Sequence, residues 1–487
     1  MTLSRSPRLA AAAALLLGAG AAGPNYQRPT VDMPVAWKTD APWREGTPGD
    51  LAAKGAWWRM FDDARLDALE QQALAANPSL AAANARLTQA RALVASASAS
   101  LYPQLGFGAR AARQKISANR PLTNYNSPNF STVQTDLLGL FAVSYEVDLS
   151  GRVQRTIEGA RASAEQSASD FENTRLLLTA DLASAYFNLR EIDIEIDVLA
   201  RSIALQRRAL ELATARHDLG ATSGLDVAQQ QALLDSTLTQ VDVLRRTRGQ
   251  FEHAIATLTG TPAPSFTLAA DTRVIAPPAV PLGVPSDVLQ RRPDVASAER
   301  AMAAANAQIG VATAAFYPSI TLAPTLGAES VALSSLFSAP SLVWSLGVSV
   351  LQPIFDAGRI RANVDFARGG YDVTVANYRR IVLTAMQEAE DGITGLAALD
   401  SATTQAQVAI ESTRRVLTLA NDRYEGGVAT YLDVITAQQG LLNNERLSAQ
   451  LQGQRLLTTV FLIKALGGDW QPNADVDAKV AADTPPR

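Results

Sequence analysis

The chain has 487 residues, of which 47% are hydrophobic and 18% charged, and its formal net charge is −4. This charge argues against a nucleic-acid-binding surface, because such surfaces concentrate lysine and arginine. There is no cysteine, and the only two histidines are His217 and His253. These counts exclude disulfides and thiolate chemistry and leave little for histidine-based metal or triad sites. Composition therefore favours a protein that is not an enzyme, and we expect no cofactor and no metal.

Residues 1–22 predict an export signal. Arg5 and Arg8 form a basic stretch, residues 9–17 are an apolar run, and small residues follow. This order is typical of a secretory signal peptide. A transmembrane anchor is the alternative, but the run is shorter than the about 20 apolar residues that a spanning helix needs. No later segment offers 18 consecutive apolar residues, so we expect an exported protein without a spanning helix.

Residues 23–61 predict an extended segment. Five prolines between positions 24 and 48 interrupt regular structure. Four of the six tryptophans lie in this segment, and we expect them to pack on a larger body; they are Trp37, Trp43, Trp57 and Trp58. From Asp62 onward the composition favours helix.

The chain from residue 62 onward contains an internal duplication. Gly151-Arg152 recurs 207 positions later as Gly358-Arg359, and Gly220 recurs as Gly427. The register runs without a gap over residues 151–260, which chance rarely produces. The sequence therefore predicts a first repeat over 62–260, a linker over 261–284, a second repeat over 285–467 and a tail over 468–487.

Each repeat contains two long segments that predict helices. Residues 153–219 contain no proline and one glycine, which predicts a helix of about 100 Å. A second helix is expected over 225–258, and the matching pair over 360–424 and 431–466. A coiled-coil stripe of apolar residues marks the first helix: Ile192, Ile196, Leu199, Ile203 and Leu210. We therefore expect long antiparallel helical hairpins, with a shorter helix over 79–100.

Two segments, about 104–148 and 319–354, change from a helical period to a period of two. Each predicts a hairpin of two strands of roughly ten or more residues, with one apolar and one small, polar face. In an exported protein this is typical of a membrane β-barrel, and a soluble sheet packed on helices is the alternative. Ser345 is expected in the lumen. The residues expected to face lipid are Phe141, Val143, Tyr145, Leu342, Trp344 and Leu346.

Four strands per chain predict an oligomer. Open strand edges cannot face lipid, and membrane barrels have at least about eight strands. Two copies would give eight strands with a filled interior, and three copies would give twelve strands with room for a lumen.

Several motifs carry a family resemblance. They are G-P-N-Y-Q-R-P at 23–29, W-W-x-x-F-x-D-x-x-L at 57–66, F-Y-P-S-I-T-L at 316–322, P-I-F-D-A-G-R at 353–359 and R-Y-E-G-G-V-A-T-Y-L-D-V at 423–434. With these motifs the chain resembles the outer-membrane efflux protein family, the TolC-like outer membrane factors, and within it the OprM/NodT lipoprotein branch. The resemblance implies a mainly α fold with a membrane β-barrel. Long antiparallel helical hairpins would form a periplasmic tunnel, and four transmembrane strands per chain would close a shared 12-stranded barrel in a homotrimer.

The resemblance also implies a function and partners. The function would be that of a passive exit duct for small toxic compounds in a tripartite pump, in the outer membrane of a Gram-negative bacterium. The partners would be a periplasmic adaptor protein, an inner-membrane RND-type transporter, outer-membrane lipid and further copies of the chain. Two alternatives stay open, namely a duct for type I protein secretion and an exported coiled-coil interaction protein that forms no channel.

By motif match, a periplasmic gate is expected at the tips of the hairpins. Its residues would be Asp226, Tyr424, Leu432 and Asp433, with a hydrogen bond between Asp226 and Tyr424. Residues that contact the adaptor at the tips would be Leu219, Gly220, Gly426 and Gly427. An alternative role for the two aspartates is to complement the helix dipole, since each lies in the first turn of a predicted helix. Two family positions differ here, Ala429 and Thr436, which implies a less charged gate.

The resemblance places a lipidated cysteine where this chain has Gly20. Without a thiol no thioether anchor can form, so we expect an unlipidated protein. Acidic groups on the predicted helices are expected on solvated faces: Glu388 with Glu390, and Asp193 with Glu195 and Asp197.

Overall fold

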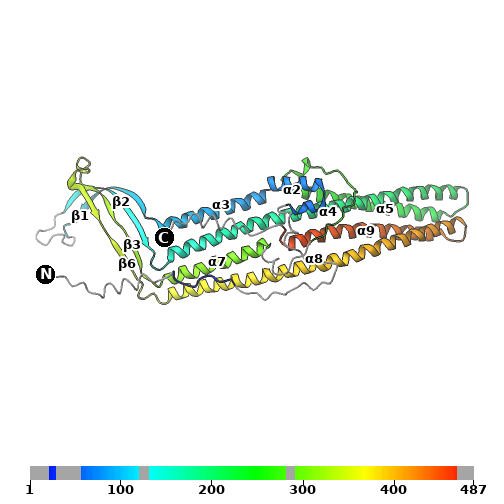
Figure 1. Ribbon diagram of the computed structural model, residues 1–487. Coiled ribbons are helices and arrows are strands. Elements are labelled where there is room, and N and C mark those ends of the chain that lie inside the picture. Colours follow the sequence, from blue (N-terminus) through cyan, green and yellow to red (C-terminus); the bar gives the residue numbers. More distant parts are fainter. Residues whose placement is uncertain (1–20, 29–55, 120–130, 281–290, 469–487) are drawn as a thin grey trace. The chain divides into compact units, whose positions relative to one another are not determined.

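The computed structural model describes residues 21–28, 56–119, 131–280 and 291–468 (Figure 1). Most of the predicted signal peptide, Gly20, Trp37, Trp43 and the predicted tail therefore lie outside the described residues. Within the described ranges, no helix combines the length and the apolar character that crossing a membrane requires.

Two similar series of elements follow one another along the chain. The first comprises η1 (Trp57–Phe61), α2 (Ala64–Ala76), α3 (Pro78–Ser98), β1 (Gln104–Ile116), β2 (Thr132–Val147), α4 (Arg152–Asp218) and α5 (Gly224–Leu258). The second comprises α7 (Pro293–Ala314), β3 (Ser319–Leu322), β4 (Thr325–Ser330), β5 (Leu342–Ser345), β6 (Val348–Leu351), α8 (Arg359–Glu425) and α9 (Tyr431–Ala465).

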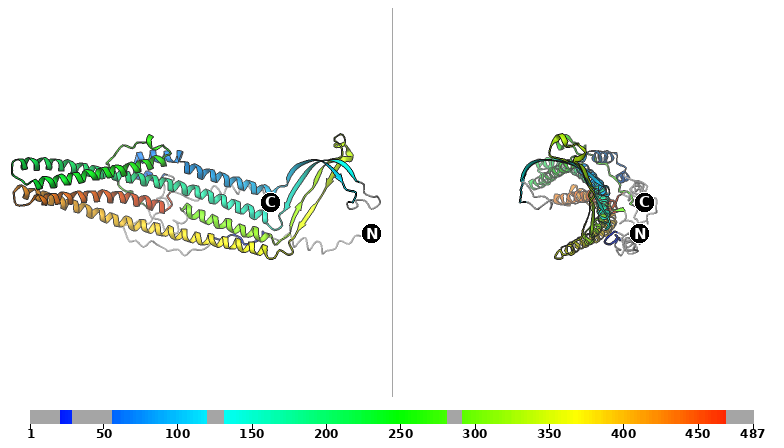
Figure 2. Two further views of the ribbon diagram at one scale, coloured as in Figure 1. Left: turned by 180° about the vertical axis from the view of Figure 1, so that it is seen from behind. Right: turned by 90° about the vertical axis from the view of Figure 1, so that its left-hand side faces the viewer.

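The predicted helices are confirmed to within two residues at each end. Helices α4 and α8 have 67 residues each, and α5 and α9 have 35 each. Figure 2 shows α5 running back beside the end of α4, and α9 beside the end of α8. The stripe expected along α4 is buried at Leu199 and Ile203, where it packs against Leu234 and Val241 of α5.

The chain divides into two compact units, each drawn from three stretches. The sheet unit comprises Met1–Pro29, Leu87–Ser167 and Ala298–Tyr378. The hairpin unit comprises Thr30–Arg86, Ala168–Ser297 and Arg379–Arg487. Neither unit coincides with one sequence repeat, because long helices such as α4 contribute to both units.

The strands of the sheet unit form an antiparallel meander. Strand β1 pairs with β2 along its whole length. Strand β2 pairs in turn with β3 and β4, and these pair with β6 and β5. Two hairpins are thus present, as the alternating segments predicted.

The prediction of two long strands in the second hairpin was wrong. Its strands are interrupted between β3 and β4 and between β5 and β6, and Leu346 lies in the second interruption. Pro324 has no amide proton and cannot donate to a ladder. Pairing still continues across the gaps, because the Val143 amide donates to the Pro324 carbonyl at 2.9 Å and the Ala323 amide donates to the Gly347 carbonyl at 2.9 Å.

One face of the sheet carries a row of large apolar side chains. Phe107, Phe141, Leu326 and Trp344 stand opposite one another on β1, β2, β4 and β5, and opposite residues share a face. Each is at least 52% exposed. Such an exposed apolar band indicates a surface that is covered in the assembled protein.

The other face of the sheet is small and polar. There Gly106 pairs with Ala142, Ala142 with Thr325, and Thr325 with Ser345. The hydroxyls of Thr325 and Ser345 are 2.9 Å apart. The strand register therefore puts Trp344 and Ser345 on opposite faces, as predicted, while contact with lipid stays a prediction.

We expect Trp344→Arg to impair assembly, because a charge in a lipid-facing band costs about 2–4 kcal/mol near the midplane. Ser345→Arg is the matched control on the opposite face and should be mild. The measurement is the yield of detergent-extracted oligomer from membranes. Equal losses at the two positions would show that the sheet does not present these faces to lipid and lumen.

Trp57 and Trp58 confirm, for the described part of the N-terminal segment, that its tryptophans pack on a larger body. Both are buried. The Trp57 indole donates to the Thr179 hydroxyl at 3.1 Å, and the Trp58 indole donates to Asp67 at 2.8 Å. The W-W motif thus joins η1 to α4 and α2.

Asp63 ties several segments of the hairpin unit together. As the N-cap of α2 its carboxylate accepts from the amides of Arg65 and Leu66. The same carboxylate accepts from the Tyr186 hydroxyl at 2.9 Å and from Arg273 at 3.1 Å. A buried charge is tolerated here because its oxygens are all used.

Glu70, on the same helix, is a buried acid of a different kind. It is 0% exposed, and neither carboxyl oxygen has a hydrogen-bond partner among the described residues. Burial, with a smaller contribution from the charge of Asp67, raises the pKa of Glu70 from 4.5 to about 9. The carboxyl is therefore protonated at neutral pH.

We expect Glu70→Gln to stabilise the protein at pH 8. Between pH 4.5 and about 9 the folded state holds a proton that the unfolded state releases, so the free energy of unfolding falls as the pH rises through that window. Glutamine has no such proton. The measurement is the Tm of detergent-purified protein from pH 4 to pH 9, with the exposed Glu211→Gln as control. A lower Tm for Glu70→Gln at pH 8 would contradict a buried neutral carboxyl.

Candidate functional site at the helical hairpin tips

The two hairpin tips share one way of ending a helix. Gly220 after α4 and Gly427 after α8 have φ values of +72° and +74°. The Val428 amide donates to the Arg423 carbonyl at 3.0 Å, and Ala221 makes the equivalent bond after α4 at 2.8 Å. This is a Schellman ending, in which glycine takes the left-handed conformation without a steric penalty. Both helices therefore stop sharply and reverse.

The residues expected to contact an adaptor lie at these turns. Leu219 is exposed, and a Cβ added at Gly220 or Gly427 would meet open space. Gly426 lies against the carbonyl of Asp422. The tips thus present apolar and backbone surface that is free in the single chain, and contact with an adaptor stays a prediction.

Asp433 has a visible structural role. The amide and the hydroxyl of Thr430 both donate to its carboxylate, at 3.0 Å each, which caps the start of α9. Leu432 beside it is exposed. The capping contacts correspond to the helix-end alternative, and a role in a gate is compatible with them.

Asp226 and Tyr424 are not joined within this chain. The Thr222 hydroxyl donates to the Asp226 carboxylate. The Tyr424 ring instead packs against the Tyr431 ring, with centroids 5.0 Å apart, and the Arg216 guanidinium lies 5.4 Å from its centre. No hydrogen bond between the two predicted partners occurs among the described residues, so such a bond would require a neighbouring copy.

Tyr431 lies at the tip but is not among the predicted gate residues. Its hydroxyl donates to Gln230 Oε1 at 2.8 Å, and Gln230 Nε2 donates to the backbone carbonyl of Gln206 at 3.1 Å. These three residues are 7%, 0% and 1% exposed. Burial raises the pKa of Tyr431 to about 12, so the hydroxyl keeps its proton at physiological pH. The sequence indicates this residue only by a difference between the repeats, because the position equivalent to Tyr431 in the first repeat is Gly224.

The expectation that Asp193 and Glu195 lie on a solvated face was wrong. Both are buried. Asp193 accepts from Arg248 at 2.6 Å, and Glu195 accepts from Gln450 and from Arg446. Helical periodicity could not reveal these partners, because they come from α5 and α9.

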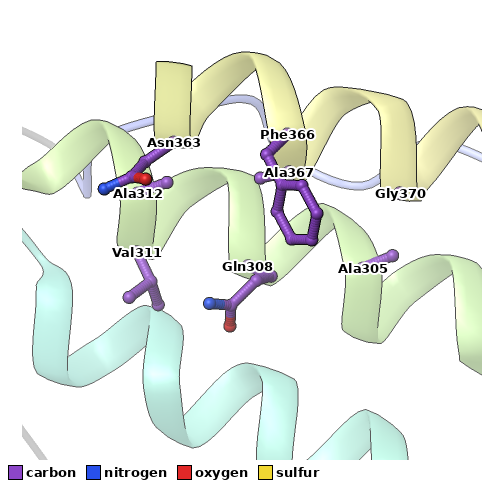
Figure 3. A pocket seen from close by; sticks show the side chains of 8 residues that line it. All are labelled: Ala305, Gln308, Val311, Ala312, Asn363, Phe366, Ala367 and Gly370. Atoms are coloured by element: carbon purple, nitrogen blue, oxygen red, sulfur yellow. The ribbon is translucent and has the colours of Figure 1, made fainter. Parts of the chain in front are cut away.

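A separate groove lies between α7 and α8 in the sheet unit. It has a volume of about 400 Å³, and Figure 3 shows the Phe366 ring pointing from α8 toward α7 beside Gln308. None of its eight lining residues is acidic or basic. It offers no group for acid–base chemistry. Likewise, no cluster of potential metal ligands occurs within the described ranges.

Sequence comparison agrees with this architecture. The family profile "Outer membrane efflux protein" matches residues 69–261 and 284–468. The pyoverdine export outer membrane protein OpmQ of Pseudomonas aeruginosa is 31% identical over 460 residues, which are 94% of this chain and 96% of that protein. The toluene efflux pump outer membrane protein TtgC of Pseudomonas putida is 29% identical over 480 residues, covering 98% of both.

Solved structures give the same result. The outer-membrane channel OprN has a TM-score of 0.85 at 29% identity, covering 92% of this chain and 99% of that chain. The open state of the Neisseria gonorrhoeae MtrE channel has a TM-score of 0.80 at 28% identity, covering 93% and 99%. An interaction protein that forms no channel is thereby set aside. The chain belongs to the outer membrane efflux protein family and is an outer-membrane efflux channel.

Proposed function

We propose that three copies of the chain form the outer-membrane exit duct of an RND-type tripartite pump. The observation that carries this is a meander of four strands, in which β3 with β4 and β5 with β6 each count as one interrupted strand. Its outer edges, β1 on one side and β5 with β6 on the other, have no pairing strand among the described residues. Strand edges cannot face lipid unpaired, so copies must join edge to edge. Three copies supply twelve strands, which is enough to enclose a lumen.

The names of the relatives support small toxic compounds as the substrate class. Their names refer to the efflux of toluene, solvent and antibiotic, and to pyoverdine export. None of these names refers to protein secretion. This supports small-molecule efflux over the alternative of a type I secretion duct.

The partners and sites follow from this proposal. The tips at Leu219, Gly220, Gly426 and Gly427 would meet a periplasmic adaptor, which connects the duct to an inner-membrane transporter. The apolar row of the sheet would face outer-membrane lipid. The two repeats, 62–260 and 285–467, would each contribute one helical hairpin and one strand hairpin. With Gly20 in place of a cysteine, the chain would carry no lipid anchor.

We expect the purified full chain to form threefold particles in detergent and conducting channels in planar bilayers. In a host that lacks its own outer-membrane duct, it should restore tolerance to toluene when produced with a matching adaptor and transporter. Restored secretion of a type I polypeptide with no gain in tolerance would favour the alternative duct. A monodisperse monomer that remains in water would overturn the proposal.

The proposed gate makes a second prediction. If Asp226 and Tyr424 bond between neighbouring copies, the double variant Tyr424→Phe plus Asp226→Ala loses a charge-assisted bond, which typically contributes about 1.5–3 kcal/mol. We expect larger single-channel conductance and leakage of large antibiotics into cells.

Asp433→Asn tests the charge separately, because asparagine keeps an oxygen for the cap of α9 while three like charges disappear from the trimer. We expect weaker cation preference and a smaller dependence on salt. Unchanged conductance in the double variant, together with unchanged selectivity in Asp433→Asn, would make these residues helix-end groups alone.

A further inference from the structure

Two exposed cations, Arg113 and Lys115, lie on strand β1 beyond the apolar row of the sheet. Both are an even number of positions from Phe107, which belongs to that row. Strand β1 pairs with β2 along all its 13 residues without a bulge. Because alternate residues of an unbroken strand share a face, both cations stand on the same face as Phe107, which we call the apolar face.

A third cation supports this assignment of faces. Arg110 lies on the opposite face by the same count, and its guanidinium pairs with the Asp136 carboxylate. Asp136 stands opposite Ala112 in the ladder, and Ala112 shares a face with Arg110. The small, polar face therefore supplies an acid to its own cation, whereas Arg113 and Lys115 stand on the other face.

The apolar face offers Arg113 and Lys115 no acidic partner among the described residues of β1 and β2. Residues 101–135 contain no aspartate or glutamate, and the β2 residues on this face, from Val133 to Val143, are all uncharged. The edge that would pair with β1 in a neighbouring copy includes residues 331–351, which also contain no acid. A negatively charged partner is therefore expected outside the protein.

The position of the two cations along β1 corresponds to the edge of a membrane. The strand rises about 20 Å from Phe107 to Arg113 at about 3.4 Å per residue, and a tilt of about 40° reduces this to about 15 Å along the membrane normal. The apolar band of a membrane barrel is about 25 Å tall, so half of it is about 12 Å. With the Phe107 row near the midplane, Arg113 lies just beyond the hydrocarbon, and Lys115 lies further out.

Chain order indicates which leaflet the cations would meet. Strand β1 follows α3, and strand β2 leads into α4, so one end of the strand pair adjoins helices. Arg113 and Lys115 lie toward the other end, where β1 connects to β2. In the proposed duct the helices are periplasmic, so the cations lie at the outer leaflet. In Gram-negative bacteria this leaflet consists largely of phosphorylated glycolipid.

We propose that Arg113, Lys115 and Thr135 bind a phosphate group of an outer-leaflet glycolipid, with one site on each chain. Thr135 stands directly opposite Arg113 on β2, which puts their Cβ atoms about 5 Å apart. A guanidinium donates two parallel hydrogen bonds to a phosphate, an ammonium adds a compact charge, and the threonine adds a hydroxyl donor. The acyl chains lie along the apolar row. The site rests on the proposed duct, because it requires the apolar face to meet lipid.

Lipid binding to the purified full chain tests this site. The probes are diphosphorylated lipid A and the same glycolipid without phosphate, each added to the detergent-solubilised oligomer, and native mass spectrometry counts the bound molecules. We expect one lipid A molecule per chain and little binding of the phosphate-free form. Binding should weaken as the salt concentration rises, because salt screens exposed charges.

Two variants remove different parts of the site. Arg113→Gln plus Lys115→Gln removes both charges, and we expect it to raise the Kd for lipid A about tenfold. Thr135→Val removes only the hydroxyl and should raise the Kd about threefold. The matched control, Arg207→Gln plus Arg208→Gln, removes two exposed charges of α4 in the hairpin unit and should bind as the wild type does.

The outcomes separate the lipid site from the duct. A chain that purifies as a water-soluble monomer would overturn the proposed duct, and the lipid site with it. A conducting channel whose charge-removing double variant binds lipid A as tightly as the wild type would overturn the site alone. Equal binding of the phosphate-free glycolipid, or an equal loss in the α4 control, would also overturn it, since acyl chains or net charge would then account for binding.

Discussion

The outer edges of the sheet, β1 on one side and β5 with β6 on the other, present amide and carbonyl groups that no strand of the described chain pairs. This constraint links the sheet to the assembly. In water such edges can be hydrated, but in lipid they must be paired. The exposed row from Phe107 to Trp344 makes water an unfavourable surrounding for one face. Pairing between copies would therefore satisfy the strand edges, and an apolar environment would cover the exposed apolar face.

Sequence reasoning succeeded where the signal is local. The long helices are free of breakers, and the gapless register of the duplication fixes their lengths twice. It failed where the outcome depends on partners far along the chain. Asp193 and Glu195 resemble surface acids until Arg248 and Gln450 are in place. Tyr431 resembles an ordinary core aromatic, because nothing near it in the sequence indicates Gln230.

Buried polar groups in the hairpin unit fall into two kinds. Asp63, Asp193 and Glu195 have arginines, amides or hydroxyls bonded to their oxygens. Glu70 has no such partners and is neutral instead. Paired buried charges add little net stability, since desolvation offsets their attraction. Their effect is on register, because each pairing is satisfied at only one relative position of the helices.

The interruption at Ala323 and Pro324 has the length of one full period of a strand. Leu322 and Leu326 therefore remain in phase, on the same face of the sheet. Removing a single residue from this gap would rotate the whole of β4 by half a turn and exchange its two faces, while β3 stayed as it was. Insertions or deletions in this interruption are therefore tolerated only when they add or remove an even number of residues. Residues 331–341, which follow the end of β4, are not restricted to length changes by an even number of residues.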